Sequence, residues 1–272
     1  MESTVSVTGT DFRIRRLFDQ ATQTAIIVPM DQGIEESFGE LDEPRDIVRA
    51  MAQAGANAFL MRRGLARYTV DCFGGRVAWV QRITGRSGLE HRDTEQLQVG
   101  SPAEALYNGA DAVVFTMFVG KAEQDWLPAY GRVSDECRRV GMPLIGEPFP
   151  IGAENALPYD GPYSIDDMRI AVRVACEEGA DVIKTWYPGD PKSMARIVAY
   201  STVPVLIAGG PKAKRPQDVL EMVKGAMDGG ARGTVMGRKI WQSADPGAMV
   251  HAISRIVREG LGVDQAMQAL AR

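Results

Sequence analysis

A lysine at the end of an apolar run is the residue in this chain best suited to chemistry. Lys184 lies in the stretch Asp181-Val-Ile-Lys-Thr-Trp186, which is predicted to be a buried β-strand. Burial and nearby cations disfavour an ammonium ion, so such a lysine can act as a neutral amine that attacks a carbonyl and forms a Schiff base. The alternative is a structural lysine, either ion-paired or extending past the strand end. Lys184 taken alone leaves both possibilities open.

Strand alternation and neighbouring acids give this lysine a chemical setting. Alternation places Trp186 on the same face as Lys184, whereas Tyr187, a further acid candidate, has the opposite parity. Glu147 ends another apolar run and is expected beside Lys184 on the adjacent strand. It could donate and accept protons, or serve only as the ion-pair partner. Asp31 ends a third run, where it could shuttle protons, orient the lysine or simply begin a loop.

Two glycine-rich turns follow the last predicted strands and suggest an anion site. Gly209-Gly210 follows one strand, and Gly237-Arg238 follows the next. Main-chain amides at such glycines can approach a phosphate closely, a short helix from Gly237 can point its N-terminus at the same anion, and Arg238 can add a bidentate contact. The alternative is a pair of ordinary turns and a surface arginine.

The elements that must position these residues alternate along the whole chain. Short runs rich in Val, Ile and Phe are separated by segments with helical periodicity, which predicts parallel βα units. The expected strands are Ala25–Met30, Asn57–Arg62, Val77–Ile83, Asp111–Met117, Pro143–Glu147, Asp181–Trp186, Pro204–Ala208 and Gly233–Met236. Eight such units close a (β/α)8 barrel, whose active sites lie at the carboxyl ends of the strands.

The chain is expected to form one domain over residues 1–272. Its length suits a barrel of roughly 250 residues, and no change in composition marks a second domain. Residues 1–9 are expected to be a loose N-terminal arm, and Asp245–Arg258 and Val263–Ala271 to be closing helices. Two long connections, Gly85–Gly100 and Ile151–Tyr163, follow strand ends and are either lids or surface insertions.

Composition narrows the function classes. The net charge is −4 and no long basic run occurs, so a nucleic-acid partner is disfavoured. No signal pattern or membrane-length apolar stretch is present, and the cytoplasm is the expected compartment. Two distant histidines, His91 and His251, and three cysteines do not suggest a metal site. No metal or other cofactor is expected.

These motifs resemble the archaeal-type class I fructose-bisphosphate aldolases over nearly the whole chain. The similarity is tightest in Gly179-Ala-Asp-Val-Ile-Lys184, Val205-Leu-Ile-Ala-Gly-Gly210 and Ala231-Arg-Gly-Thr-Val-Met-Gly-Arg238-Lys-Ile-Trp-Gln-Ser243. The resemblance implies a (β/α)8 barrel, a Schiff base at Lys184 and an acidic residue at Asp31. It also implies phosphate binding at Gly209, Gly210, Gly237 and Arg238, catalysis without metal, and ring-shaped homo-oligomers, often decamers.

The chain departs from that family at two places. Gln32 stands where the family commonly has histidine in Asp-His-Gly. The family's aromatic-x-Tyr-Pro-Arg-Gly stretch corresponds here to Glu147-Pro-Phe149-Pro-Ile-Gly152, so the proton-donating tyrosine and the positive charge of the arginine are missing. Other branches of the family build amino-heptulosonate phosphates, or transfer an acetyl unit from a phosphorylated pentose derivative to coenzyme A.

The sequence as a whole is interpreted as a class I aldolase for a small phosphorylated ketose or keto sugar. Lys184, kept neutral by burial, would be the nucleophile, and Glu147 with Asp31 would move protons. Trp186 and Phe149 would form a wall of the pocket, and dihydroxyacetone phosphate or a similar ketone is the expected donor. The alternatives are a coenzyme A-dependent acyltransferase on a phosphorylated keto sugar and a non-catalytic phosphosugar-binding barrel.

Overall fold

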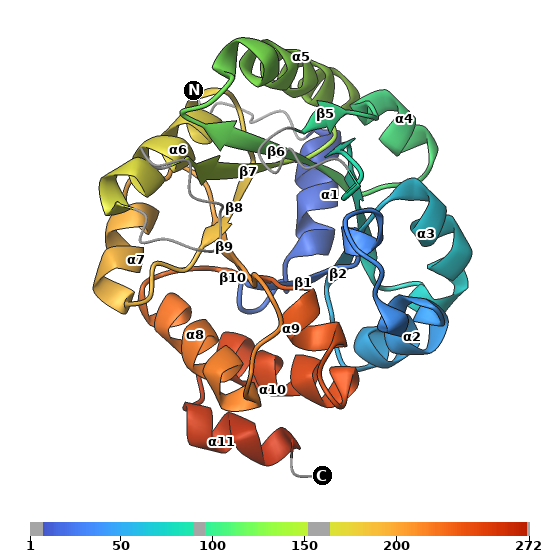
Figure 1. Ribbon diagram of the computed structural model, residues 1–272, viewed down its shortest axis with the longest axis vertical. Helices are drawn as coiled ribbons and strands as arrows, with labels where there is room; N and C mark the ends of the chain where they lie inside the picture. Colours follow the sequence, from blue (N-terminus) through green and yellow to red (C-terminus); the bar gives the residue numbers. More distant parts are fainter. Residues whose placement is uncertain (1–7, 90–95, 152–163, 271–272) are drawn as a thin grey trace, which may run out of the picture.

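Eight parallel strands form a closed barrel, as expected from the alternating pattern. The computed structural model describes residues 8–89, 96–151 and 164–270 (Figure 1). The barrel strands follow the order β1-β10-β9-β8-β7-β6-β3-β2. Their bounds are β1 Ala25–Pro29, β2 Ala58–Met61, β3 Ala78–Arg82, β6 Ala112–Val119, β7 Leu144–Pro150, β8 Val182–Trp186, β9 Val205–Ala208 and β10 Gly233–Val235. All eight predicted strands are therefore present, with each end within three residues of its expected position.

Helices surround the barrel on the outside (Figure 1). They are α2 Pro44–Gln53, α3 Arg63–Thr69, α4 Pro102–Tyr107, α5 Glu123–Val140, α6 Ile165–Glu177, α7 Pro191–Val198, α8 Pro216–Asp228, α9 Arg238–Trp241, α10 Pro246–Glu259 and α11 Val263–Met267. Short 3-10 turns occupy Gln32–Ile34, Gly39–Leu41, Val70–Phe73 and Gln268–Leu270. Many of these helices begin with proline at their first position, where the missing amide costs no hydrogen bond.

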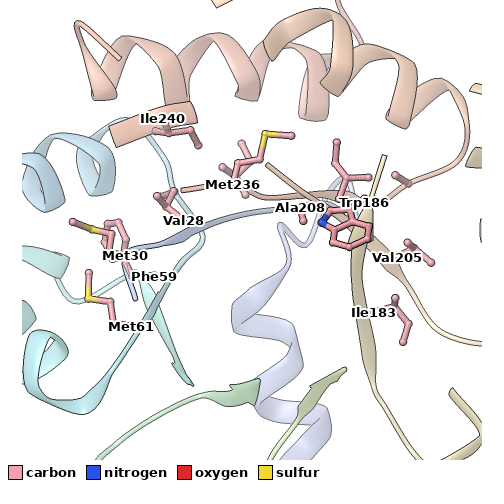
Figure 2. Packing of buried hydrophobic residues seen from close by; sticks show 14 of the residues in the cluster. Val28, Met30, Phe59, Met61, Ile183, Trp186, Val205, Ala208, Met236 and Ile240 are labelled. Atoms are coloured by element: carbon pink, nitrogen blue, oxygen red, sulfur yellow. The ribbon is translucent and has the colours of Figure 1, made fainter. Parts of the chain in front are cut away.

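Apolar residues form two separate layers because neighbouring residues of a strand point to opposite sides. The inner layer fills the barrel with small and branched side chains: Ala25, Ile27, Ala58, Leu60, Ala78, Val80, Ala112, Val114, Ile145, Val182, Leu206 and Val235. The outer layer lies between strands and helices, and Figure 2 shows part of it, including Val28, Met236 and Ile240. Alternation of these layers fixes which residues at the strand ends can point into the barrel.

An additional helix closes the barrel at the amino ends of its strands, which we call the lower end. Helix α1, Gly9–Leu17, lies inside the ring in Figure 1. Leu17 and Phe18 pack with the inner layer, and Arg16 pairs with Asp111 just before β6. The expected loose arm is therefore wrong at its last residue, because Gly9 begins a helix that is anchored to the barrel; residues 1–7 lie outside the described part of the chain.

The first long connection contains a small hairpin that the sequence did not indicate. Strands β4 (Thr84–Gly85) and β5 (Leu97–Gln98) pair in antiparallel fashion, and the amide of Gly88 donates to the Ile34 carbonyl at 2.8 Å. This connection therefore folds over the loop that follows β1. The second connection falls on residues 152–163, outside the described residues.

The helix predicted at Asp245–Arg258 is present as α10, and the one predicted at Val263–Ala271 is shorter, ending as α11 followed by a 3-10 turn. Among the described residues, none of the helices has the length and apolar character needed to cross a bilayer.

Candidate active site

Side chains with chemical function form the layer directly above the apolar interior. Each lies two residues beyond an inner-layer residue on its strand: Arg82 after Val80, Thr116 after Val114, Glu147 after Ile145 and Lys184 after Val182. Strands β3, β6, β7 and β8 are consecutive neighbours in the barrel, so strand parity points all four side chains inward at adjacent positions. This is the carboxyl end of the strands, where barrel enzymes carry their active sites.

Lys184 forms an ion pair with Glu147. Its Nζ contacts Oε1 of the carboxylate, and the residues are 5% and 3% exposed. Thr116 donates its hydroxyl to the other carboxylate oxygen, opposite Glu147 in the β6–β7 register. Nζ of Lys184 therefore lies directly against the Glu147 carboxylate, the ion-pair contact that the sequence left open for this acid.

Arg82 links the two carboxylates of this site. Its Nε donates to Oδ2 of Asp31 at 2.7 Å, and its Nη1 donates to Thr116 and Glu147. The Arg82 side chain is 9% exposed, so these ion pairs are held away from water. Asp31, Arg82, Glu147 and Lys184 thus form a buried chain of alternating charge, which we call the charge relay cluster.

The cluster keeps both acids ionised. Burial on its own would raise the pKa of Asp31, but Arg82 and Lys184 outweigh it, and the pKa falls below the ordinary value. The same balance of burial against Arg82 and Lys184 lowers the pKa of Glu147. Burial would also lower the pKa of Arg82, but Asp31 and Glu147 together raise it. A carboxylate that stays ionised can act as a base.

The cluster faces a cavity of about 300 Å³. Its described lining residues include Asp31, Gln32, Glu35, Arg82, Arg86, Thr116, Phe118, Glu147, Phe149, Lys184 and Arg238. Oδ1 of Asp31 is buried and has no hydrogen-bond partner among the described residues. A buried oxygen of this kind needs a donor, which a hydroxyl group held in the cavity can supply.

One acid at the rim behaves differently from Asp31 and Glu147. Glu35 follows the turn Gln32–Ile34 and lines the cavity. Desolvation by neighbouring atoms and the charge of Asp31 raise its pKa, although part of its side chain is exposed. The cavity therefore has two strongly ionised carboxylates in its depth and a more readily protonated one at its edge.

The two aromatic candidates are stacked on each other. The rings of Phe149 and Trp186 lie 4.1 Å apart and 8° from parallel. Phe149 lines the cavity, and Trp186 packs against it. Tyr187 points elsewhere, since a Cβ added at Gly225 of α8 would lie 2.2 Å from the tyrosine hydroxyl. The structure thus places Tyr187 away from Lys184, as its parity indicated.

The predicted anion site is only partly at the cavity. Arg238 lines it, whereas Gly209, Gly210 and Gly237 do not appear among its described lining residues. Close packing accounts for two of these glycines: a Cβ at Gly237 would meet the Pro29 carbonyl at 2.3 Å, and one at Gly209 would meet Met236 at 3.1 Å. Gly210 has a positive φ of 69°, which favours glycine.

Arg82 and Thr116 are the site residues that the sequence reasoning missed. Arg82 closes an apolar run with the same parity as Val80, the signal that singled out Lys184 on its own strand. Its guanidinium brings a positive charge into the site from β3, where it contacts Asp31 and Glu147. Thr116 gave no such signal, since threonine is common in strands.

Comparison with known proteins identifies the family. Residues 25–243 match the DeoC/LacD family aldolases. The chain belongs to the DeoC/LacD aldolase family. This family comprises class I aldolases, lyases that work through a Schiff base on lysine.

Relatives of this DeoC/LacD aldolase differ in what they are named for. A 2-amino-3,7-dideoxy-D-threo-hept-6-ulosonate synthase from Halobacterium salinarum is 34% identical over 246 residues, 89% of each chain. A 2-amino-4,5-dihydroxy-6-oxo-7-(phosphonooxy)heptanoate synthase from Streptomyces griseus is 30% identical over 247 residues, 90% of this chain and 89% of the other.

Solved structures of archaeal fructose 1,6-bisphosphate aldolase superpose with a TM-score of 0.80 at 29% identity, covering 92% of this chain and 98% of the other. One such structure, with a TM-score of 0.80, 29% identity and coverage of 92% and 99%, has its catalytic lysine covalently bound to the carbinolamine intermediate of the substrate. The resemblance deduced from the motifs is therefore confirmed.

Proposed function

We propose that Lys184 is the Schiff-base nucleophile of an aldolase that makes or cleaves a carbon–carbon bond in a small phosphorylated ketose or keto sugar. The observation that carries the proposal is the position of Nζ. It is buried against Glu147, and the residue lines a cavity of about 300 Å³ that also holds Arg238. A lysine with only a structural role would have no need of such a cavity.

Glu147 activates Lys184 by taking its proton. The neutral amine then adds to the substrate ketone, and the carbinolamine loses water to give an iminium ion. In the cleavage direction, the bond between the α- and β-carbons of the iminium ion breaks. A base removes the proton of the hydroxyl group on the β-carbon. The electrons of that bond move to the iminium nitrogen, leaving an enamine and releasing an aldehyde. Protonation and hydrolysis of the enamine return the ketone and the free lysine.

Asp31 and Glu147 are the bases available for the hydroxyl step. Oδ1 of Asp31 has no described partner and can accept a hydrogen bond from that hydroxyl, while Glu147 lies closest to the nitrogen. Phe149 cannot transfer a proton, so the carboxylates take over the task that a tyrosine would perform. General acid–base help of this kind is worth roughly 10²–10⁴-fold in rate.

Arg82 acts as a positioning residue for both carboxylates. Through its contacts with Asp31 and Glu147 it holds both carboxylates in place, and it keeps Asp31 ionised while Glu147 carries the proton taken from Lys184. Glu147 then has a second cation beside it at every stage of the reaction. The cluster therefore stays nearly neutral overall while a proton moves from the lysine to the acid.

Arg238 is the proposed contact for the substrate phosphate. It lines the cavity together with Lys184, and a guanidinium can bind phosphate through two parallel hydrogen bonds. Amides of Gly209, Gly210 and Gly237 would complete the site as the substrate enters. The relatives named above as synthases and the aldolase structures make a phosphorylated ketone such as dihydroxyacetone phosphate the expected donor, with the stacked Phe149 and Trp186 as one wall.

Reduction with borohydride in the presence of dihydroxyacetone phosphate tests the proposal. We expect the intact protein to gain the mass of one reduced adduct, located at Lys184 by peptide mapping. Lys184→Met should stay folded and gain no mass, whereas Lys192→Met, at an exposed lysine on α7, should behave as the unmodified protein.

A mass gain that persists in Lys184→Met would exclude this lysine as the nucleophile. Tight binding of phosphorylated ketones and aldehydes with no adduct from any of them would instead favour a binding protein. Turnover that requires coenzyme A would indicate the acyltransferase. Any of these results would remove the aldolase assignment for Lys184.

A further inference from the structure

We propose that a second anion site lies outside the barrel mouth, between the start of α8 and helix α9, and that it binds a small organic polyanion carrying phosphate groups. The site is a hollow of about 360 Å³. Four cationic residues line it: Lys212, Lys214, Arg215 and Lys239. We call it the basic hollow.

The basic hollow is positively charged, whereas the protein as a whole is negatively charged. The whole chain has 35 acidic and 31 basic residues and a net charge of −4, yet no Asp or Glu is among the described residues that line the hollow. Arg215 pairs with Asp218. Across the described residues, Lys212, Lys214 and Lys239 make no ion pair. Like charges brought together without acids repel one another, and an anionic ligand removes that cost.

Lys239 contributes a cation to the wall of the basic hollow. It is half-buried on α9, and burial together with the neighbouring Arg238 lowers its pKa. Asp218 acts on it only from a distance beyond ion-pair contact. A lysine held in such surroundings is better satisfied by a bound anion than by the protein alone. The geometry of the hollow, rather than this shift, sets where that anion would lie.

The basic hollow is separate from the catalytic cavity. The described lining residues of the two cavities have none in common. Arg238 lines the catalytic cavity and Lys239, the next residue of α9, lines the basic hollow, so this short helix has a cation on each side. An anion in one cavity therefore cannot be the anion in the other.

The lining also indicates the class of ligand. Lysines bind phosphate as point charges and have no fixed geometry to satisfy. Pro216, Val219 and Met249 supply an apolar part of the wall, which suits the organic portion of a ligand. The volume exceeds that of a single water or simple ion many times over. A phosphorylated organic molecule satisfies both the charge and the apolar wall.

Titration calorimetry with inorganic pyrophosphate at low salt tests the site. To silence the catalytic cavity, the measurements use the full-length Arg238→Gln protein as background. We expect this background to bind one pyrophosphate per chain. Adding Lys212→Gln and Lys239→Gln should weaken binding at least tenfold, and adding Lys192→Gln, an exposed lysine on α7, should leave it unchanged.

Four results would overturn the proposal. Complete loss of binding in Arg238→Gln would mean that the catalytic cavity is the anion site. Equal affinity with and without Lys212 and Lys239 would place the anion elsewhere. Dissociation of an oligomer by the double substitution, measured by light scattering, would mean that the hollow meets an acidic segment of a second copy. A Lys214→Glu variant that retains full binding would count equally against it.

Discussion

At the scale of single residues, Arg82 is the side chain whose removal tells most about the site. It contributes the positive charge between Asp31 and Glu147, and no substitution of either acid alone would report on both. Arg82 reaches Lys184 only through Glu147. A substitution of Arg82 therefore tests whether a residue can affect catalysis without contacting the nucleophile.

We expect Arg82→Met to shift the acid limb of the kcat profile to higher pH. Without the guanidinium, burial dominates and the pKa of Glu147 rises, so the base is protonated at pH values where the native enzyme is active. Breaking a buried ion pair also costs about 3–5 kcal/mol of stability. That corresponds to roughly 6–20 °C in Tm for a protein of this size.

Arg82→Lys should restore part of the rate and return the limb toward its native position, because the charge is kept while the fork geometry is lost. Arg63→Met is the matched control, since Arg63 pairs with Glu104 at an exposed position. A purely structural role for Arg82 would lower Tm and leave the pH profile where it was.

The sequence predicted Lys184 and its acid neighbour Glu147 as site residues, but not Arg82, the cation that joins Glu147 to Asp31. Lys184 was recognisable because it ends an apolar run and matches the nucleophile of the family that the chain resembles, and Glu147 because it is an acid that ends the adjacent run. Arg82 ends a run in the same way, but no motif drew attention to it. Only the strand order, with β6 between β3 and β7, brings its guanidinium to Glu147 from 65 residues away in sequence.

At the scale of elements, helix α1 is the element that the amino-acid composition of its segment did not predict. It carries Asp11, Arg15 and Arg16, and only Leu17 is buried within it. Such a polar segment has no apolar stripe from which a packed helix could be predicted. Its apolar end nevertheless closes the lower end of the barrel. This role depends on the closed barrel, so the sequence of the helix alone does not reveal it.

We expect Leu17→Ala to destabilise the protein by about 2–5 kcal/mol, as for large-to-small changes in well-packed cores. Leu17 is fully buried in the inner layer, at the opposite end from Lys184. Chemical denaturation measures the loss, and kcat at a temperature well below Tm should change little. Leu97→Ala on β5, whose side chain is 63% exposed, is the control and should be nearly neutral.

The eight strands were predictable because each expected run is four to seven residues long, mostly apolar, and bounded by Gly, Pro or Asp. Strands β4 and β5 were not, since two residues each give no periodicity and Leu97 and Gln98 are exposed. Their pairing depends on the loop after β1, to which the hairpin is hydrogen bonded. Contacts of this kind follow from tertiary structure and not from local pattern.

At the scale of the whole molecule, the charge relay cluster ties stability to pH. Asp31 and Glu147 have folded pKa values below their ordinary values of about 4. The unfolded chain therefore binds more protons than the folded chain as pH falls below about 4, and stability decreases with it. Half-buried Asp181, whose pKa is raised by desolvation, acts in the opposite direction at pH values just above about 4.

We expect the stability difference between the native protein and Glu147→Gln to depend on pH. Above pH about 5 the native protein keeps the full contribution of ionised Glu147. Below pH about 4 that contribution declines as the folded carboxylate is protonated, so the two unfolding free energies should converge. Denaturant titrations between pH 7 and the lowest pH that preserves reversible folding, roughly 3, measure it; a constant difference would contradict the lowered pKa.

The inner layer fills the barrel below the catalytic cavity, and Leu17 and Phe18 pack against it at the lower end. If Lys184 is the nucleophile as proposed, the substrate and both of its fragments therefore pass through the opening at the carboxyl end of the strands. The aldehyde is released first and lies nearer the opening than the enamine that is still bonded to Lys184. The aldehyde must therefore leave before the ketone does. Excess aldehyde should therefore inhibit cleavage by occupying the opening of the cavity, even when the concentration of the ketone product is low.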